Sequence, residues 1–108
     1  MDALSALRLP AALCTIYDTP PSSADHRIIR TALAIFNDVI TRAAFRRGLP
    51  LIDLRLICDE DEDYANPIEP SVQGGDKMAA AIAMLVSGRA GPPCQSVVIA
   101  AKPARNEP

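Results

Sequence analysis

The chain has 108 residues, a formal net charge of -2 at pH 7 and 49% hydrophobic residues, with two Phe, two Tyr and no Trp. This length predicts one domain, whose core has few large side chains to fill it. The sequence has no basic excess of the kind that phosphate contacts require, so nucleic acid is not an expected partner.

The chain contains no apolar run near the ~20 residues of a membrane span, and its N-terminus lacks a basic segment followed by an apolar one. We therefore expect a soluble, cytoplasmic protein without a membrane partner. Cys14, Cys58 and Cys94 are widely spaced, which fits neither a disulfide framework nor a metal motif. Reduced thiols are expected.

The first part of the chain predicts a short helix and then a strand. Residues 2–8 carry an acidic residue at their start and a basic one at their end, and Pro10 ends this helix. Residues 11–17 form a nearly unbroken apolar run, which is typical of a strand that is buried on both faces of a parallel sheet.

The longest predicted helix follows a Pro-Ser break and ends before Gly48. Ser23 is the expected N-cap, and Asp25 suits the positive first turn. Apolar residues recur at helical spacing: Ile28, Ile29, Ala32, Leu33, Phe36, Val39, Ile40 and Ala43.

Residues 51–57 are predicted to form a second strand, which completes a βαβ unit. A long loop over 58–75 and an Ala-rich helix over 76–87 follow. We expect an α/β domain over 1–89 and a Pro-containing tail over 90–108, with a possible further strand at 96–101.

The loop before the last helix reads Asn66-Pro67-Ile68-Glu69-Pro70-Ser71, followed by Gly74 and Lys77-Met78-Ala79. This segment resembles the last block of the SGNH (GDSL-type) ester hydrolases, which runs Asp-x-x-His-Pro-Ser/Asn-x-x-Gly-x-x-Lys-Ile-Ala. In that block the Asp and the His orient and activate a serine nucleophile. Asn66 and Glu69 occupy these two positions here.

The resemblance extends over residues 13–87 and covers the carboxyl-terminal half of the family's domain. It is also carried by Thr15-Ile16-Tyr17-Asp18 and by Gly48-Leu49-Pro50-Leu51-Ile52-Asp53. It implies a truncated flavodoxin-like (SGNH-type) fold, a parallel βαβα unit. The chain holds no Gly-Asp-Ser and no Gly-x-Asn-Asp block, so we expect a half-domain, either a truncated reading frame or a free-standing remnant.

The resemblance implies weak hydrolysis of a small-molecule ester or phosphoester by loop carboxylates at a subunit boundary. Glu69, Asn66 and Asp63 are the candidate catalytic residues, because a buried carboxylate can act as a general base. A polar loop stiffened by two prolines is the simpler interpretation of Asn66 and Glu69. A catalytically inactive fold remnant or assembly module is therefore the first alternative.

The acidic run over 59–63 follows a predicted strand, at the edge where α/β sheets place ligands. Asp59, Asp61 and Asp63 are candidate ligands for Mg²⁺ or Ca²⁺, which would permit metal-assisted phosphoester hydrolysis. A solvated acidic loop without a cofactor is the competing interpretation, since consecutive residues do not converge on one point.

Gly74 and Gly75 place two backbone donors at the start of a helix, where together with Ser71 they can bind a substrate or an anion. Chain reversal and close packing explain the two glycines equally well. His26 is interpreted as a surface residue of a first helical turn, and Cys58 as a buried or inert thiol.

Two parallel strands with two long helices cannot cover both faces of a sheet or close its edges. We therefore expect a homo-oligomer, a dimer or higher. It would form by strand pairing across a two-fold axis or by exchange of the 96–101 segment between subunits.

Overall fold

The computed structural model describes residues 9–88 and 96–99. In chain order its elements are β1 (Leu13–Cys14), α2 (His26–Arg47), β2 (Leu51–Ile52), α3 (Leu54–Ile57), the 3₁₀ turn η1 (Asp61–Asp63) and α4 (Val72–Val86). The predicted α/β class is confirmed. The helix predicted over 2–8 and the domain boundary at 89–90 lie outside the described residues.

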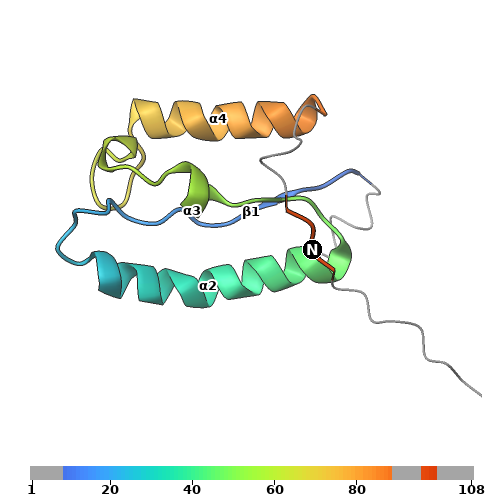
Figure 1. Cartoon of the computed structure of the whole chain (residues 1–108), viewed down its shortest axis with the longest axis horizontal. Helices are drawn as coiled ribbons and strands as arrows, with labels where there is room; N and C mark the ends of the chain where they lie inside the picture. Colours follow the sequence, from blue (N-terminus) through green and yellow to red (C-terminus); the bar gives the residue numbers. More distant parts are fainter. Residues whose placement is uncertain (1–8, 89–95, 100–108) are drawn as a thin grey trace, which may run out of the picture.

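The two strands form a parallel sheet in which Leu13 lies opposite Leu51 and Cys14 opposite Ile52. The N–H of Leu13 donates to the carbonyl of Pro50, and the N–H of Thr15 donates to that of Ile52, both at 3.0 Å. The sheet lies between α2 on one side and α4 on the other (Figure 1). The predicted βαβ unit is present, with α2 as its connection.

The end of α2 is as predicted, and its start is not. Gly48 adopts the left-handed conformation (φ 63°), and its N–H bonds to the carbonyls of Ala44 and Phe45. The N-cap is Asp25, without a side-chain cap bond. Ser23, the predicted cap, lies in the preceding turn, where its N–H donates to Pro20 and its carbonyl accepts from His26.

The strand predicted over 51–57 is wrong beyond Ile52, where the chain turns into α3. Side chains take the next backbone donors: the Asp53 carboxylate accepts the N–H of Arg55 at 3.1 Å, and the hydroxyl of Thr15 accepts the N–H of Leu54 at 2.9 Å. An Asp that caps in this way starts a helical turn in place of a longer ladder.

The last helix starts earlier than predicted, at Val72, because Ser71 caps it and accepts the N–H of Gly74 at 3.1 Å. Within the described part of the predicted strand at 96–101, residues 96–99 form no strand. The side chains of Val97 and Ile99 are 88% and 89% exposed.

Few apolar side chains are buried in the described part of the chain: Ala44, Leu54, Cys58 and Tyr64. Four polar residues are buried as deeply: Thr15, Thr19, Asn37 and Asp63. Each of the four makes hydrogen bonds to another segment. Polar contacts between segments, more than a large apolar core, position these elements.

Asn37 acts as a substitute for a neighbouring strand. Its amide oxygen accepts the N–H of Ile16 at 2.7 Å, and its amide nitrogen donates to the carbonyl of Ile16 at 3.1 Å. Ile16 lies two residues beyond the end of β1, so this pair satisfies both backbone groups of Ile16 and joins α2 to the end of the sheet. The predicted strand over 11–17 stops at Cys14 in the ladder, and Ile16 is not open to pairing with another chain.

We predict that Asn37→Leu lowers the free energy of unfolding by about 2–3 kcal/mol, because two backbone groups of Ile16 lose their partners. Urea unfolding followed by circular dichroism measures this. Asp38→Ala, on the exposed side of the same helix, removes only a surface ion pair with Arg42 and should cost less than about 0.5 kcal/mol. Equal losses in both variants would contradict the assignment.

Candidate functional site

The segment between α3 and α4 is organised around the carboxylate of Asp63, which is fully buried. Its Oδ1 accepts from the amide of Gln73 at 2.9 Å. Its Oδ2 accepts from the ammonium of Lys77 at 2.9 Å and from the N–H of Glu60 at 3.0 Å. The acidic turn η1 (Asp61–Asp63) and α4 are therefore joined through one side chain.

Burial by itself raises the pKa of Asp63, but the hydrogen bonds from Gln73 and Lys77 and the charge of Lys77 outweigh it. The pKa of this carboxyl lies below its ordinary value as a result. The Asp63 carboxylate is ionised, enclosed and already bound on both oxygens. It anchors the turn, and the geometry gives no support to its predicted role in catalysis.

The predicted anion site at the start of α4 is already occupied by the protein itself. The N–H of Gly74 donates to the hydroxyl of Ser71, and the N–H of Gly75 donates to the carbonyl of Ser71 at 2.8 Å. The hydroxyl of Ser71 in turn donates to the carbonyl of Glu62. These residues cap the helix, so the geometry gives no support to the predicted substrate or anion binding at Ser71, Gly74 and Gly75.

Gly74 is required by close packing. A Cβ at this position would collide with the carbonyl oxygen of Asp63, whereas a Cβ at Gly75 would meet no atom within 4 Å. The N–H of Ser71 donates to the same Asp63 carbonyl at 2.8 Å. The backbone of the acidic turn thus lies directly on the first turn of α4.

Asn66 and Glu69, the two positions that resemble the catalytic pair of the SGNH block, lie together in an exposed loop. Glu69 therefore lacks the burial on which its predicted basicity depends. The amide oxygen of Asn66 accepts the N–H groups of Ile68 and Glu69 at 2.9 and 2.8 Å. Its amide nitrogen donates to the Glu69 carboxylate at 3.3 Å. Asn66 therefore folds the loop as an Asx-type turn and orients the carboxylate of Glu69.

Two further contacts hold this loop in place. An antiparallel bridge pairs Tyr64 with Pro70, and the N–H of Ala65 donates to the carbonyl of Glu69 at 2.9 Å. The buried hydroxyl of Thr19 donates to the carbonyl of Pro67 at 3.0 Å. The loop is fixed to the segment that follows β1, so Glu69 stands on a positioned turn.

The three candidate metal ligands of the acidic run are engaged in separate contacts. Asp61 accepts the N–H of Ser22 at 2.9 Å, Asp63 is enclosed as described, and Asp59 lies 3.9 Å from Lys77. Among residues 9–88 and 96–99, no group of three His, Cys, Asp or Glu side chains could hold a metal ion. The arrangement gives the predicted Mg²⁺ or Ca²⁺ site no support.

Cys58 is buried, and its thiol lies 3.8 Å from the carbonyl of Gly74. Burial, with a smaller contribution from the charge of Asp63, raises the pKa of this thiol. The hydroxyl of Tyr64 donates to the Cys58 carbonyl at 2.8 Å. A protonated, enclosed thiol is a poor nucleophile.

His26, which the sequence places in a first helical turn, is the first residue of α2.

A cleft of about 330 Å³ lies at the carboxyl ends of the two strands, and sequence reasoning missed it. It is lined by Asp18, Arg30, Ala34, Asn37, Asp53, Arg55 and Leu56. Asp53 directly follows β2, and ligands of open α/β sheets bind beyond such strand ends. That position is the available signal, but the strand predicted over 51–57 places Asp53 in a strand interior.

Within the cleft, Arg55 and Asp53 form a bidentate pair, with Nε 2.8 Å from Oδ1 and Nη2 2.6 Å from Oδ2. The hydrogen bonds from Arg55 lower the pKa of Asp53, in opposition to its burial. The Thr15 hydroxyl also donates to Oδ1, at 3.1 Å. The pair neutralises itself, so its first effect is to hold the start of α3 on β1.

No protein-family model, curated protein or solved structure matches the chain. In the part of the chain that the structure describes, no helix has both the length and the apolar character needed to cross a membrane.

The two glycines of α4 should respond to Ala in opposite directions. Gly74→Ala should lower the free energy of unfolding by more than about 2 kcal/mol, because the backbone of Asp63 must move. Gly75→Ala should raise it by about 0.5–1 kcal/mol, since it removes a flexible residue from a helix interior. Chemical denaturation of both variants measures this, and a stable Gly74→Ala protein would refute the packing.

The lowered pKa of Asp63 predicts a defined pH dependence. This carboxylate stabilises the fold fully above its unfolded pKa near 3.8, and the contribution is lost as pH falls through the still lower folded value. Asp63→Asn should cost about 2 kcal/mol at pH 7. The difference in stability between the two proteins should shrink below about pH 4. A difference that stays constant from pH 7 to pH 2 would contradict this account.

Proposed function

We propose that the chain is an SGNH-type ester hydrolase unit in which Glu69 is the general base and Asn66 positions it. The observation that carries the proposal is the contact of 3.3 Å between the Asn66 amide and the Glu69 carboxylate. The two residues stand where the family has its Asp and His, and they keep the relation of an orienting group to a base. The loop that presents them is also held at both ends.

The chemistry that Glu69 can support is direct hydrolysis. Its carboxylate takes a proton from a water molecule whose oxygen adds to the ester carbonyl carbon. The protonated carboxyl then returns the proton to the departing alkoxide oxygen, which yields an acid and an alcohol and regenerates Glu69. Because this carboxylate is exposed and the Gly-Asp-Ser block does not occur in the chain, we expect slow turnover of activated small-molecule esters.

A second candidate function is an assembly unit without catalysis. Many large apolar side chains are exposed, among them Ile28 at 72%, Ile35 at 69% and Val39 at 66%. Surfaces of this kind mark sites of interaction with other proteins. The absence of aryl-ester turnover in the purified chain would favour this function over the first.

We predict that Glu69→Gln lowers the turnover of an aryl acetate by at least about tenfold, because the amide cannot accept a proton from water. The rate is measured from the release of the phenol product, in either a stopped or a continuous assay. Glu62→Gln is the matched control, since Glu62 is an exposed carboxylate that also lies between α3 and α4. The turnover rate of this variant should stay within about twofold of that of the unmodified protein. A Glu69→Gln protein that is as active as the control would refute the proposal.

A further inference from the structure

Helix α2 carries two apolar faces, and only one of them is packed. The packed side holds Ile29, Leu33, Asn37, Ile40 and Ala44, all of them buried or half-buried. A neighbouring stripe is exposed to solvent: Ile28 at 72%, Ile35 at 69%, Phe36 at 60% and Val39 at 66%. Ala32, which is exposed, and Ala43, which is half-buried, belong to the same stripe by their spacing.

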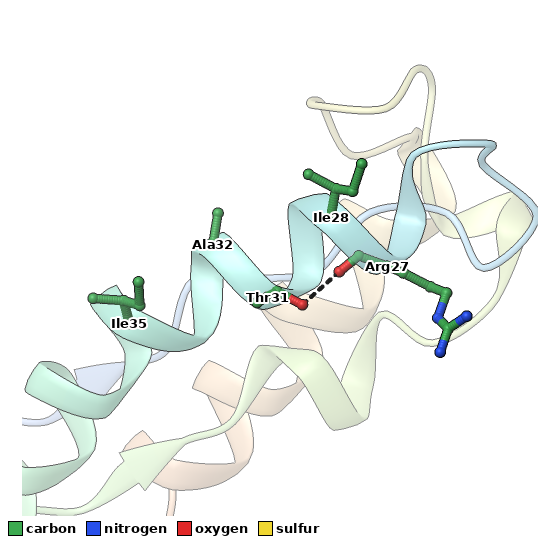
Figure 2. Close-up of a pocket in the computed structure, with 5 residues that line it drawn as sticks. All are labelled: Arg27, Ile28, Thr31, Ala32 and Ile35. Carbon is green, nitrogen blue, oxygen red and sulfur yellow. Dashed lines mark hydrogen bonds between the residues drawn. The ribbon is translucent and has the colours of Figure 1, made fainter.

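At about 100° per residue, the exposed stripe occupies an arc of about 100° that adjoins the packed face. Ile28, Ala32 and Ile35 project from one side of the helix (Figure 2). Together with Arg27 and Thr31 they line a shallow groove of about 380 Å³. The Thr31 hydroxyl already donates to the carbonyl of Arg27 at 2.7 Å, so it needs no further partner when the groove is covered.

The exposed stripe ends in opposite charges. By the same helical spacing, Asp25 at the start of α2 and Arg46 near its end fall on the arc of the apolar residues. Both are exposed. Asp25 is the N-cap but makes no cap bond with its side chain.

The stripe is symmetric about its midpoint, between Ile35 and Phe36. An antiparallel second copy of α2 would place Ile35 opposite Phe36, Ala32 opposite Val39 and Ile28 opposite Ala43. The small Ala32 then lies where the larger Val39 of the other copy approaches, as close helix packing requires. The same register places Asp25 opposite Arg46 at both ends of the contact.

We propose that this face binds a second copy of the chain, with the two α2 helices antiparallel about a two-fold axis at Ile35–Phe36. Two further features support a second copy as the occupant. The charges at the two ends of the stripe complement each other only in the antiparallel arrangement, which also opposes the two helix dipoles favourably. Strand pairing that includes Ile16 is disfavoured, because Asn37 occupies both backbone groups of this residue.

This inference rests on the assembly-unit candidate and names its partner, and it is independent of the hydrolase proposal because it uses none of the residues of the 66–71 loop. Sedimentation equilibrium of the full chain over a range of concentrations is the first test. Ile35→Asp should raise the dissociation constant of the dimer more than tenfold. Val72→Asp, which changes a still more exposed apolar residue at the start of α4, should leave it within about twofold.

Charge reversal provides a second test that requires no new polar group in the apolar stripe. Asp25→Arg and Arg46→Asp should each raise the dissociation constant about fivefold to tenfold, and the double variant should return it close to the original value. Effects on the helix dipole would add in the double variant, so recovery is specific to the intermolecular pair.

A monomer at all concentrations, or a dimer that Ile35→Asp does not weaken, would overturn the proposal. If the dissociation constant of the double charge variant is as high as that of the single variant that binds more weakly, the antiparallel register is overturned. Circular dichroism of each variant checks that α2 is formed. If Ile35→Asp fails this check, the charge-reversal variants decide the test.

Discussion

The buried carboxylate of Asp63 is the contact on which the arrangement of the acidic turn, the 66–71 loop and α4 depends. It receives one hydrogen bond from its own turn and two from α4. Because Gly74 lies directly on the Asp63 carbonyl, the turn and the helix approach each other more closely than any side chain at position 74 would allow. The loop that carries Asn66 and Glu69 extends from this junction.

The same strategy recurs elsewhere in the fold. Asn37 ties α2 to the end of β1, Thr15 ties β1 to the start of α3, and Thr19 ties the following segment to Pro67. Each bond is directional and joins residues far apart in the chain. With only four buried apolar residues in the described part, these bonds define the geometry, and apolar burial contributes less than in larger domains.

These internal contacts also separate the candidate site residues into those whose polar groups are already bound and those whose polar groups are open. Asp63, Ser71, Gly74 and Gly75 are occupied by contacts within the protein. Glu69 differs from them because its carboxylate is exposed, and its one contact among the described residues, from the Asn66 amide, leaves its other oxygen available. A residue that is held in position but keeps an open acceptor is suited to chemistry, and this contrast is why Glu69 is the base in the proposed mechanism.

The sequence by itself determined the α/β class, the long helix, its end at Gly48 and the loop from Asn66 to Ser71, because these depend on local periodicity, on a left-handed glycine and on prolines. Tertiary structure alone decided that the second strand ends at Ile52, where Thr15 from another segment takes the next backbone donor. It also decided that Asp63 is an anchor and that half of the apolar arc of α2 faces solvent. Such outcomes depend on partners distant in the chain, and local sequence patterns carry no information about which distant group will meet a given side chain.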